Sequence, residues 1–270
     1  MSGDFVYVEG EIPFYQSKKF NKHGIRHAFF TKKGGVSVGA FESLNFAVGT
    51  AEITDTEENV FENHARAASV FGLTADDICR SYQTHTDNVE IATGSDRGRG
   101  LTLPPYDRGV DGLVTVERDM LLSVRSADCV PILLCDTEKS VCGAVHAGWR
   151  GTVAGIAKNA VEKMVSLGAR RENIIAAIGP CIGVCCYEVG RELYAAFTEK
   201  NSEYSDFFTE KGDKYMLDLN AANERILQSA GIGRDNISIS RICTKCNSDK
   251  FFSHRVSGPV RGTMSAFICL

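Results

Sequence analysis

Two short apolar runs near the middle of the chain are separated by a polar turn. Residues 130–134 and 141–145 are apolar, and residues 137–140 between them are polar. This spacing predicts two adjacent antiparallel strands joined by a tight turn. Cys129 stands at the entry of the first strand and His146 at the exit of the second. The hairpin is therefore expected to bring a thiol and an imidazole together at one sheet edge, as a metal site or a Cys–His nucleophile requires.

Short apolar runs alternate with helical patterns along the rest of the chain. The strand patterns cover residues 25–31, 78–93, 110–115, 120–125, 173–179, 237–242 and 264–270. The helical patterns cover residues 54–71, 153–167, 188–198 and 220–230, and residues 202–214 are expected to form a loop. No repeat or low-complexity linker divides them. The order predicts one α/β domain with a large mixed sheet, folded into two layers with helices outside.

Two of the helical patterns carry specific expectations. In the first, Phe61 and Ala68 recur on one face, and His64 beside them is expected to be partly exposed. In the second, Thr152 is the expected N-cap. The free N–H groups of that helix would then face His146 and Arg150 and form an anion pocket, to which the guanidinium adds a fork suited to phosphate.

Composition excludes several classes of partner. The chain has 270 residues, of which 43% are hydrophobic and 24% charged, with a net charge of −4. The mixed charges favour neither nucleic acid nor an anionic membrane as a partner. No apolar run approaches the ~20 residues of a membrane span. Residues 1–4 carry an acid and no basic-apolar leader, so we expect no secretory signal and a cytoplasmic protein with mostly free thiols.

Two groups of cysteines suggest a metal without proving one. Cys181, Cys185 and Cys186 lie within six residues, but their spacing is not that of a zinc-finger pair. Cys243 and Cys246 form a C-x-x-C motif, which suits zinc, redox chemistry or neither. Without a second pair at zinc-finger spacing, structural zinc is the less favoured interpretation.

Three polar segments are further candidates for a site. His85 lies in a polar patch within a strand-like run, which suggests a bend at a site, and Asp87 beside it could fix the tautomer of a ligand imidazole. Residues 32–37 contain two glycines and two lysines; a solvated turn is favoured over an anion site. Asp111 before Gly112 suits a turn and a ligand contact equally.

Together these motifs resemble the laccase-domain family, also called the multicopper-polyphenol-oxidase-like or peptidoglycan editing factor family. The resemblance covers the chain from about residue 25 to the end. The matching segments are residues 27–31, 34–37, 43–45, 83–85, 111–115, 127–131, 145–151, 178–182, 243–244 and 252–255.

The resemblance implies a fold, an activity and a metal site. It implies a four-layer fold in which two mixed β-sheets pack between α-helices, as a single cytoplasmic domain over residues 25–270 that follows an N-terminal segment, 1–24. It implies a zinc-dependent purine nucleoside phosphorylase, acting on adenosine, inosine and methylthioadenosine, with adenosine deaminase activity. The implied zinc ligands are His85, Cys129 and His146.

Other residues receive roles in the reaction. Cys129 and His146 are expected at the catalytic centre, and Asp128 or Asp111 is expected to exchange protons with the departing base. The residues expected to contact substrate or phosphate are Lys32, Asn45, Arg150 and Thr152. Two departures stand out: Lys32 replaces a frequent arginine, and Arg261 opens an Arg-Gly-Thr sequence where the family often has Thr-Gly-Arg.

Three alternatives remain at this stage. A copper-dependent polyphenol oxidase would use the same thiolate and imidazoles for Cu²⁺, but a laccase needs several coppers and more histidines than the six present. A metal-free hydrolase would use Cys129 and His146 directly. A non-catalytic protein would close the zinc site with a fourth ligand, for example Cys181 or Cys246. The expected partners are purine nucleosides and phosphate, and the expected assembly is a monomer or a small homo-oligomer.

Overall fold

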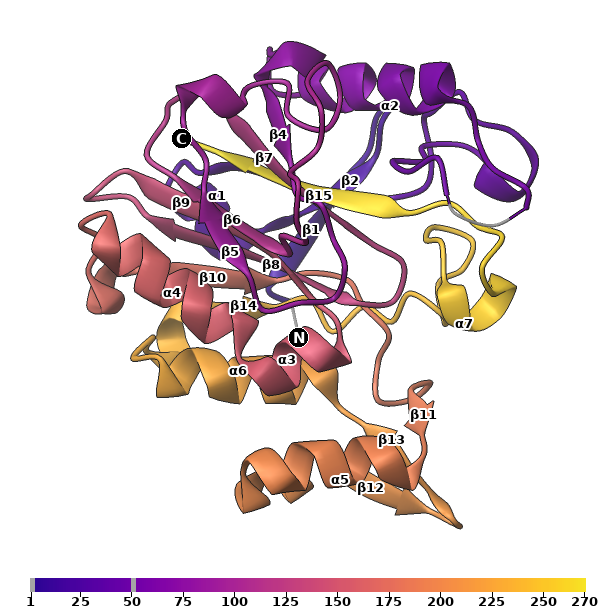
Figure 1. Ribbon diagram of the computed structural model, residues 1–270, viewed down its shortest axis with the longest axis vertical. Coiled ribbons are helices and arrows are strands. Elements are labelled where there is room, and N and C mark those ends of the chain that lie inside the picture. Colours follow the sequence, from indigo (N-terminus) through magenta and orange to yellow (C-terminus); the bar gives the residue numbers. More distant parts are fainter. Residues whose placement is uncertain (1–2, 50–51) are drawn as a thin grey trace.

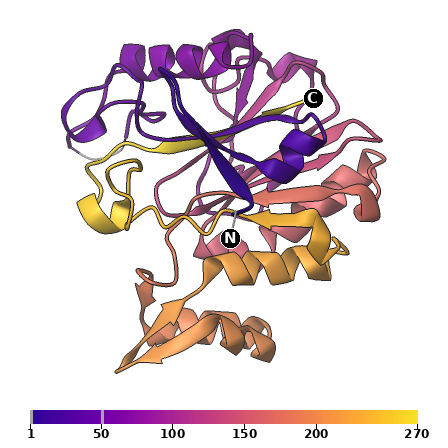
Figure 2. The same cartoon turned by 180° about the vertical axis from the view of Figure 1, so that it is seen from behind.

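Two six-stranded mixed sheets pack against each other in the computed structural model, which describes residues 3–49 and 52–270 (Figure 1). The first sheet has the order β1-β2-β3-β15-β7-β4. Its strands are β1 (Phe5–Val8), β2 (Phe14–Ser17), β3 (Arg26–Phe30), β15 (Met264–Cys269), β7 (Leu121–Ser126) and β4 (Ile78–Arg80). The N-terminal residues thus add β1 and β2 to the edge of this sheet, as the view from behind also shows (Figure 2).

The second sheet carries the central hairpin. Its order is β14-β10-β8-β9-β6-β5. Its strands are β14 (Ile237–Ile239), β10 (Ile175–Ile178), β8 (Val130–Asp136), β9 (Val141–Ala147), β6 (Gly112–Thr115) and β5 (Val89–Ile91). A separate small sheet has the order β11-β13-β12, with β11 (Glu188–Val189), β13 (Lys214–Leu217) and β12 (Phe208–Lys211). The predicted hairpin is therefore confirmed as β8 and β9, within a sheet of mixed direction.

Helices cover the outer faces of the two large sheets (Figure 1). The helices are α1 (Lys18–Lys22), α2 (Glu57–Ser69), α3 (Trp149–Ala154), α4 (Ile156–Ser166), α5 (Arg191–Lys200), α6 (Leu219–Ser229) and α7 (His254–Ser257). Helix α2 packs on the first sheet, and α4 and α6 pack on the second. The layers run helix, sheet, sheet, helix, which confirms the four-layer fold. No helix among residues 3–49 and 52–270 is long and apolar enough to cross a membrane.

Strand β8 explains why the sheets hold together. Alternate side chains point to opposite faces of a strand. Ile132 and Leu134 pack toward the α4 and α6 side, whereas Leu133 and Cys135 pack between the two sheets. Because both faces are covered, every residue of β8 is buried. Each fully buried aliphatic side chain contributes about 1.5–3 kcal/mol to folding stability. The strand end beside Cys129 is therefore held by a well-packed core.

The helix predicted over residues 54–71 is shorter than expected and turned to a different face. Its N-cap is Thr56, whose hydroxyl accepts the N–H of Asn59. Phe61 is 43% exposed, whereas His64 is fully buried, so both expectations for this helix were wrong. His64 is accommodated because its Nδ1 contacts the carbonyl of Val60 at 2.7 Å.

Three other patterns were only partly right. The strand predicted over 78–93 is two strands, β4 and β5, with the expected bend at His85 between them. The helix predicted over 153–167 is interrupted at Gly155, whose φ of 89° ends α3 before α4 begins. The loop predicted over 202–214 contains a 3-10 turn and strand β12, and pairs with β13 to form the small sheet beside α5.

Candidate metal and substrate site

The end of the β8–β9 hairpin brings a thiol and an imidazole together. Pro131 pairs with His146 in the antiparallel register, so Cys129 lies just beyond the strand end. The loop between β4 and β5 adds His85, whose Nε2 lies 4.0 Å from Cys129 Sγ. The ligating atoms of these three side chains all lie within 4.8 Å of one another. The structure therefore assembles the predicted trio from segments far apart in the sequence.

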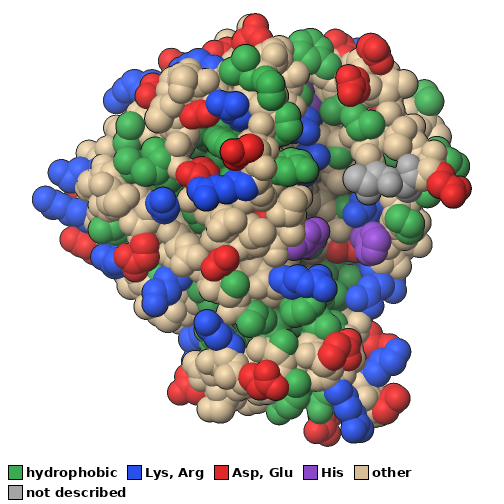
Figure 3. Space-filling model, viewed as in Figure 1, with side chains coloured by type: hydrophobic (Ala, Val, Ile, Leu, Met, Phe, Trp, Pro, Cys, Tyr) green, Lys and Arg blue, Asp and Glu red, His purple; other side chains and the backbone are tan. Residues whose placement is uncertain are grey.

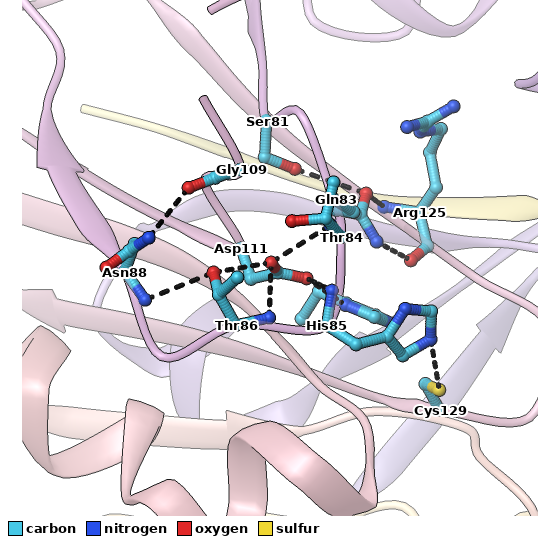
Figure 4. A network of polar contacts seen from close by, with 11 residues as sticks. Ser81, Gln83, Thr84, His85, Thr86, Asn88, Gly109, Asp111, Arg125 and Cys129 are labelled. Atoms are coloured by element: carbon cyan, nitrogen blue, oxygen red, sulfur yellow. Dashed lines mark hydrogen bonds and ion pairs between the residues drawn. The ribbon is translucent and has the colours of Figure 1, made fainter. Parts of the chain in front are cut away.

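A buried carboxylate holds the His85 loop in place. The N–H groups of Thr84, His85 and Thr86 donate to Asp111 at 3.1, 3.0 and 2.8 Å, as Figure 4 shows. The Thr86 hydroxyl donates to the same carboxylate at 2.9 Å. These bonds keep His85 in a left-handed conformation with a φ of 63°, which non-glycine residues rarely adopt. Asp111 thus aims the His85 ring at Cys129.

The same carboxylate orients His146. Asp111 Oδ1 lies 2.8 Å from His146 Nδ1, which leaves Nε2 on the side of the thiol. Burial by itself would lower the pKa of His146, but Cys129 and Asp111 raise it to about 9. Burial would raise the pKa of Asp111, and the bond to His146 reverses that shift. A carboxylate behind a ligand imidazole fixes its tautomer.

Asp111 is therefore a positioning residue. It has no exposed surface, and its oxygens are occupied by His146 and the 84–86 loop. Asp111 does not line the cavity described below, so its place favours the orientation of histidines over the expected proton exchange with substrate. Asp87 does not fix a tautomer either; its carboxylate accepts from Asn159 at 3.2 Å.

The donor set suits a zinc ion. Burial would raise the pKa of Cys129, but the contacts with His146 and His85 lower it to about 6, so the thiolate is favoured. Zinc bonds of about 2.3 Å to sulfur and 2.0–2.1 Å to nitrogen place tetrahedral S and N ligands about 3.6 Å apart, close to the separation of Cys129 and His85. Gly148 leaves room for this approach, because a Cβ there would lie 3.0 Å from His85 Cδ2 and 3.1 Å from Cys129 Sγ.

Two members of the trio, His85 and Cys129, line a cavity of about 340 Å³. The cavity is lined by His85, Ala127, Asp128, Cys129, Trp149, Arg150, Ile182, Tyr187, Leu219, His254, Arg255 and Arg261. On the face of the molecule seen in Figure 3, histidine side chains lie in a hollow bordered by Lys and Arg side chains. A hollow with apolar walls, a metal-ligating group and several cations suits a small anionic or polar ligand.

The guanidinium groups at this cavity use only some of their N–H donors in contacts with the protein. Arg150 stacks over Trp149 at 4.4 Å, and Arg255 stacks over Tyr187 at 5.1 Å. The Nε atom of Arg261 is buried and has no hydrogen-bond partner among the described residues. These arginines thus leave donors free for an anion. The sequence predicted Arg150 as a phosphate-binding residue. It assigned Arg255 no role beyond its place in the matching segment 252–255, and it did not show that Arg261 joins them.

Asp128 is the carboxylate that lines the cavity. Its φ is 94°, and its oxygens accept from the Thr244 hydroxyl at 2.6 Å, the Ser253 hydroxyl at 3.0 Å and the Arg255 N–H at 2.7 Å. These donors come from the C-terminal part of the chain, so Asp128 ties that segment to the hairpin. The carboxylate is held in one orientation beside Cys129.

A family model described as "Multi-copper polyphenol oxidoreductase laccase" matches residues 26–270. The chain belongs to this family. The matched region contains the whole candidate site, from His85 to Arg261.

Relatives in this laccase family carry names of nucleoside enzymes. A purine nucleoside phosphorylase of Deinococcus radiodurans is 39% identical over 91% of this chain and 89% of its own length. The purine nucleoside phosphorylase YlmD of Bacillus subtilis is 34% identical, with 94% and 91% covered. Adenosine deaminase RL5, from an unknown prokaryotic organism, is 35% identical, with 86% and 88% covered.

Solved structures of similar proteins have the same fold. The protein YfiH of Bacillus licheniformis, described as hypothetical, superposes with a TM-score of 0.89 at 33% identity and covers 98% of both chains. YlmD of Geobacillus stearothermophilus superposes with a TM-score of 0.88 at 33% identity, with 99% and 98% covered.

Three residues predicted to bind substrate or phosphate lie away from the cavity. Lys32 donates to the Ser248 carbonyl at 2.7 Å and lines a different cavity of about 430 Å³. Asn45 is fully buried, and its amide bonds to Asp55 at 2.8 Å. Neither side chain reaches the metal-ligating trio.

Thr152 was also misplaced by the sequence pattern. Helix α3 begins at Trp149 with Gly148 as its N-cap, so Thr152 lies inside the helix. Its side chain is buried and accepts a hydrogen bond from Asn223 Nδ2 at 3.1 Å. Arg150 remains at the cavity, as expected.

Proposed function

We propose that the protein is a zinc-dependent purine nucleoside phosphorylase that also deaminates adenosine. The observation that carries the proposal is the trio of His85, Cys129 and His146, of which His85 and Cys129 line an arginine-lined cavity. The names of the similar enzymes from Deinococcus radiodurans and Bacillus subtilis support the phosphorylase activity, and the name of RL5 supports the deaminase activity.

Phosphorolysis requires an anion held beside the ribose. Arg150, Arg255 and Arg261 line one cavity, and guanidinium groups bind phosphate oxygens through charge-assisted hydrogen bonds. We assign phosphate binding to these three residues. Lys32, Asn45 and Thr152 are left out of this assignment, because they do not line the cavity.

The trio holds the metal and Asp128 acts on the base. When bound, Zn²⁺ supplies Lewis-acid chemistry at the cavity wall, and three protein ligands leave one position of a tetrahedral ion for substrate. Asp111 keeps His146 and His85 directed at that position. Asp128 is the acidic residue that lines the cavity, so we assign it the proton exchange with the departing base.

The positions of the histidines do not favour a multi-copper oxidase. A multi-copper centre needs several histidine-rich sites. His27 and His64 are buried away from the cavity and bond to backbone groups. Among the described residues, the histidine-containing group able to hold a metal is the trio of His85, Cys129 and His146.

The metal-free hydrolase is separated from this proposal by chelation. Close contact of Cys129 with His146 also suits a Cys–His nucleophile pair. A hydrolase of that kind keeps its activity after zinc removal, whereas the proposed enzyme loses both activities.

Product analysis tests the proposal. Purified protein is incubated with adenosine, with and without phosphate. Adenine and ribose 1-phosphate are expected only with phosphate, and inosine is expected in both cases. The Cys129→Ala variant is expected to form none of these products. Full turnover by this variant, or adenine release that ignores phosphate, contradicts the proposal.

A further inference from the structure

A second group of thiols lies outside the proposed active site. The sulfur atoms of Cys185, Cys186, Cys243 and Cys246 all lie within 4.8 Å of one another. The pairs come from two segments about sixty residues apart, as the separation of Cys186 and Cys246 shows. None of these side chains has a role in the proposed nucleoside reaction.

Backbone hydrogen bonds bring the two segments together. Cys181 and Cys243 form a parallel bridge, in which Thr244 N–H donates to Cys181 O at 2.9 Å and Cys181 N–H donates to Ile242 O at 3.2 Å. Each segment then turns sharply. Cys186 N–H donates to Gly183 O at 2.9 Å, and Asn247 N–H donates to Cys243 O at 3.1 Å. Both turns thus present their thiols to the same point.

The sulfur separations match the edges of a metal-centred tetrahedron. Cys246 Sγ lies 3.6 Å from Cys185 Sγ and 3.4 Å from Cys186 Sγ. Zn–S bonds of about 2.3 Å place tetrahedral sulfurs about 3.8 Å apart. A disulfide requires only two of the thiols and leaves the gathering of the other two unexplained.

Gly183 provides a hydrogen bond and space for this group of thiols. Gly183 N–H donates to Cys243 Sγ at 3.3 Å, and hydrogen bonds of this kind support thiolate ligands. A Cβ at position 183 would lie 3.2 Å from Cys185 Sγ and 3.1 Å from Cys243 Cβ. A glycine is therefore needed for the two turns to approach this closely.

We propose that Cys185, Cys186, Cys243 and Cys246 bind a structural zinc ion as four thiolates. Zinc is the common ion in tetrahedral sulfur sites. Four protein ligands leave no open position, so this zinc has a structural part and takes none in the reaction. The assignment of this zinc does not rest on the proposed nucleoside chemistry.

The structural zinc would fix one wall of the cavity. Thr244 follows Cys243 directly and donates to the Asp128 carboxylate at 2.6 Å. Tyr187 follows Cys186 and lines the cavity. Clamping the two turns therefore holds both Asp128 and Tyr187 in place.

Zinc analysis of the Cys129→Ala variant isolates this site. That variant lacks a ligand of the trio, so it is expected to retain one zinc per chain, with four sulfur neighbours at about 2.3 Å by X-ray absorption. Absence of zinc, a nitrogen neighbour, or iron in its place overturns the proposal. Loss of zinc at the trio alone leaves this result unchanged, so failure of the proposed function is distinguishable.

Variants of the cluster supply the second arm. Adding Cys246→Ser or Cys185→Ser to the Cys129→Ala chain is expected to remove the remaining zinc. The matched control is Cys79→Ser, because Cys79 is buried elsewhere and contacts the Tyr106 hydroxyl at 3.4 Å. It is expected to keep one zinc. Full zinc content in both cluster variants contradicts the assignment; if they do not fold, the absorption spectrum of Cys129→Ala alone still decides.

Discussion

Replacing Asp111 with asparagine is expected to weaken the zinc site through His146. Asp111 accepts His146 Nδ1 and the His85 N–H on one oxygen, and Thr84 and Thr86 donors on the other. An amide keeps its oxygen toward one set only. If the amide oxygen stays with the Thr84 and Thr86 donors, the amide NH₂ faces His146 Nδ1. That nitrogen must then accept a hydrogen bond. The imidazole proton moves to Nε2, the nitrogen needed for the metal.

The size of the effect follows from these bonds. Changing the partner of a ligand histidine lowers metal affinity by about 10–100-fold, or about 1.4–2.7 kcal/mol. The His85 N–H also loses a charged acceptor, which costs about 1.5–3 kcal/mol of folding stability. Both effects are expected together, since one carboxylate serves both histidines.

Chelator competition measures the affinity, and thermal unfolding measures the stability. The matched control is Asp87→Asn, the same change on the loop that carries His85, where the carboxylate contacts Asn159 and not His146. It is expected to keep wild-type affinity. A folded Asp111→Asn protein that binds zinc as tightly as wild type refutes the orienting role of Asp111.

Three further predictions concern folding, packing and phosphate. Burial lowers the pKa of His27 to about 4, so the unfolded chain binds a proton that the folded chain does not between pH about 6.5 and about 4. Folding stability should therefore fall by about 3 kcal/mol as pH drops through this window, and denaturant titrations of His27→Gln should show a correspondingly flatter pH dependence. Gly148→Ala places a Cβ 3.1 Å from the Cys129 thiol and should destabilise the zinc-bound protein by about 1–3 kcal/mol. The control Gly233→Ala has open space around it and should leave the stability unchanged. Equal melting temperatures for the two variants would contradict the packing argument. Arg261→Met should raise the KM for phosphate roughly 10–100-fold without slowing phosphate-independent deamination, and an unchanged KM would remove Arg261 from the phosphate site.

The hairpin and the trio could be predicted because local patterns specify them. Two continuous apolar runs separated by a polar turn predict β8 and β9, and the register of a tight hairpin then places Cys129 near His146. His85 stood out because its polar patch interrupts an apolar run. These signals depend on neighbours in sequence, which a single chain displays directly.

The misplaced residues depend on contacts that the sequence does not display. Thr152 has the residue type of an N-cap, but α3 begins three residues earlier, with Gly148 as its N-cap close to His85 and Cys129. Asn45 is polar yet fully buried, since Asp55 and neighbouring backbone groups satisfy its amide. Such partners are set by tertiary packing rather than by local pattern.

The thiol cluster shows the same limit. A C-x-x-C at Cys243 lacked a second pair at zinc-finger spacing, so structural zinc was the less favoured interpretation. The missing pair is Cys185 and Cys186, brought close by the bridge between Cys181 and Cys243. The order of strands in the sheet, not spacing, decides which cysteines meet.

The most direct test of the central claim is zinc titration of metal-free protein, followed by phosphate-dependent release of adenine from adenosine. Activity is predicted to be absent without zinc and to rise until the site of His85, Cys129 and His146 is filled. The Cys129→Ala variant is predicted to stay inactive at every zinc concentration. Equal activity before and after zinc addition, or activation of that variant by zinc, would contradict a nucleoside reaction at this metal site.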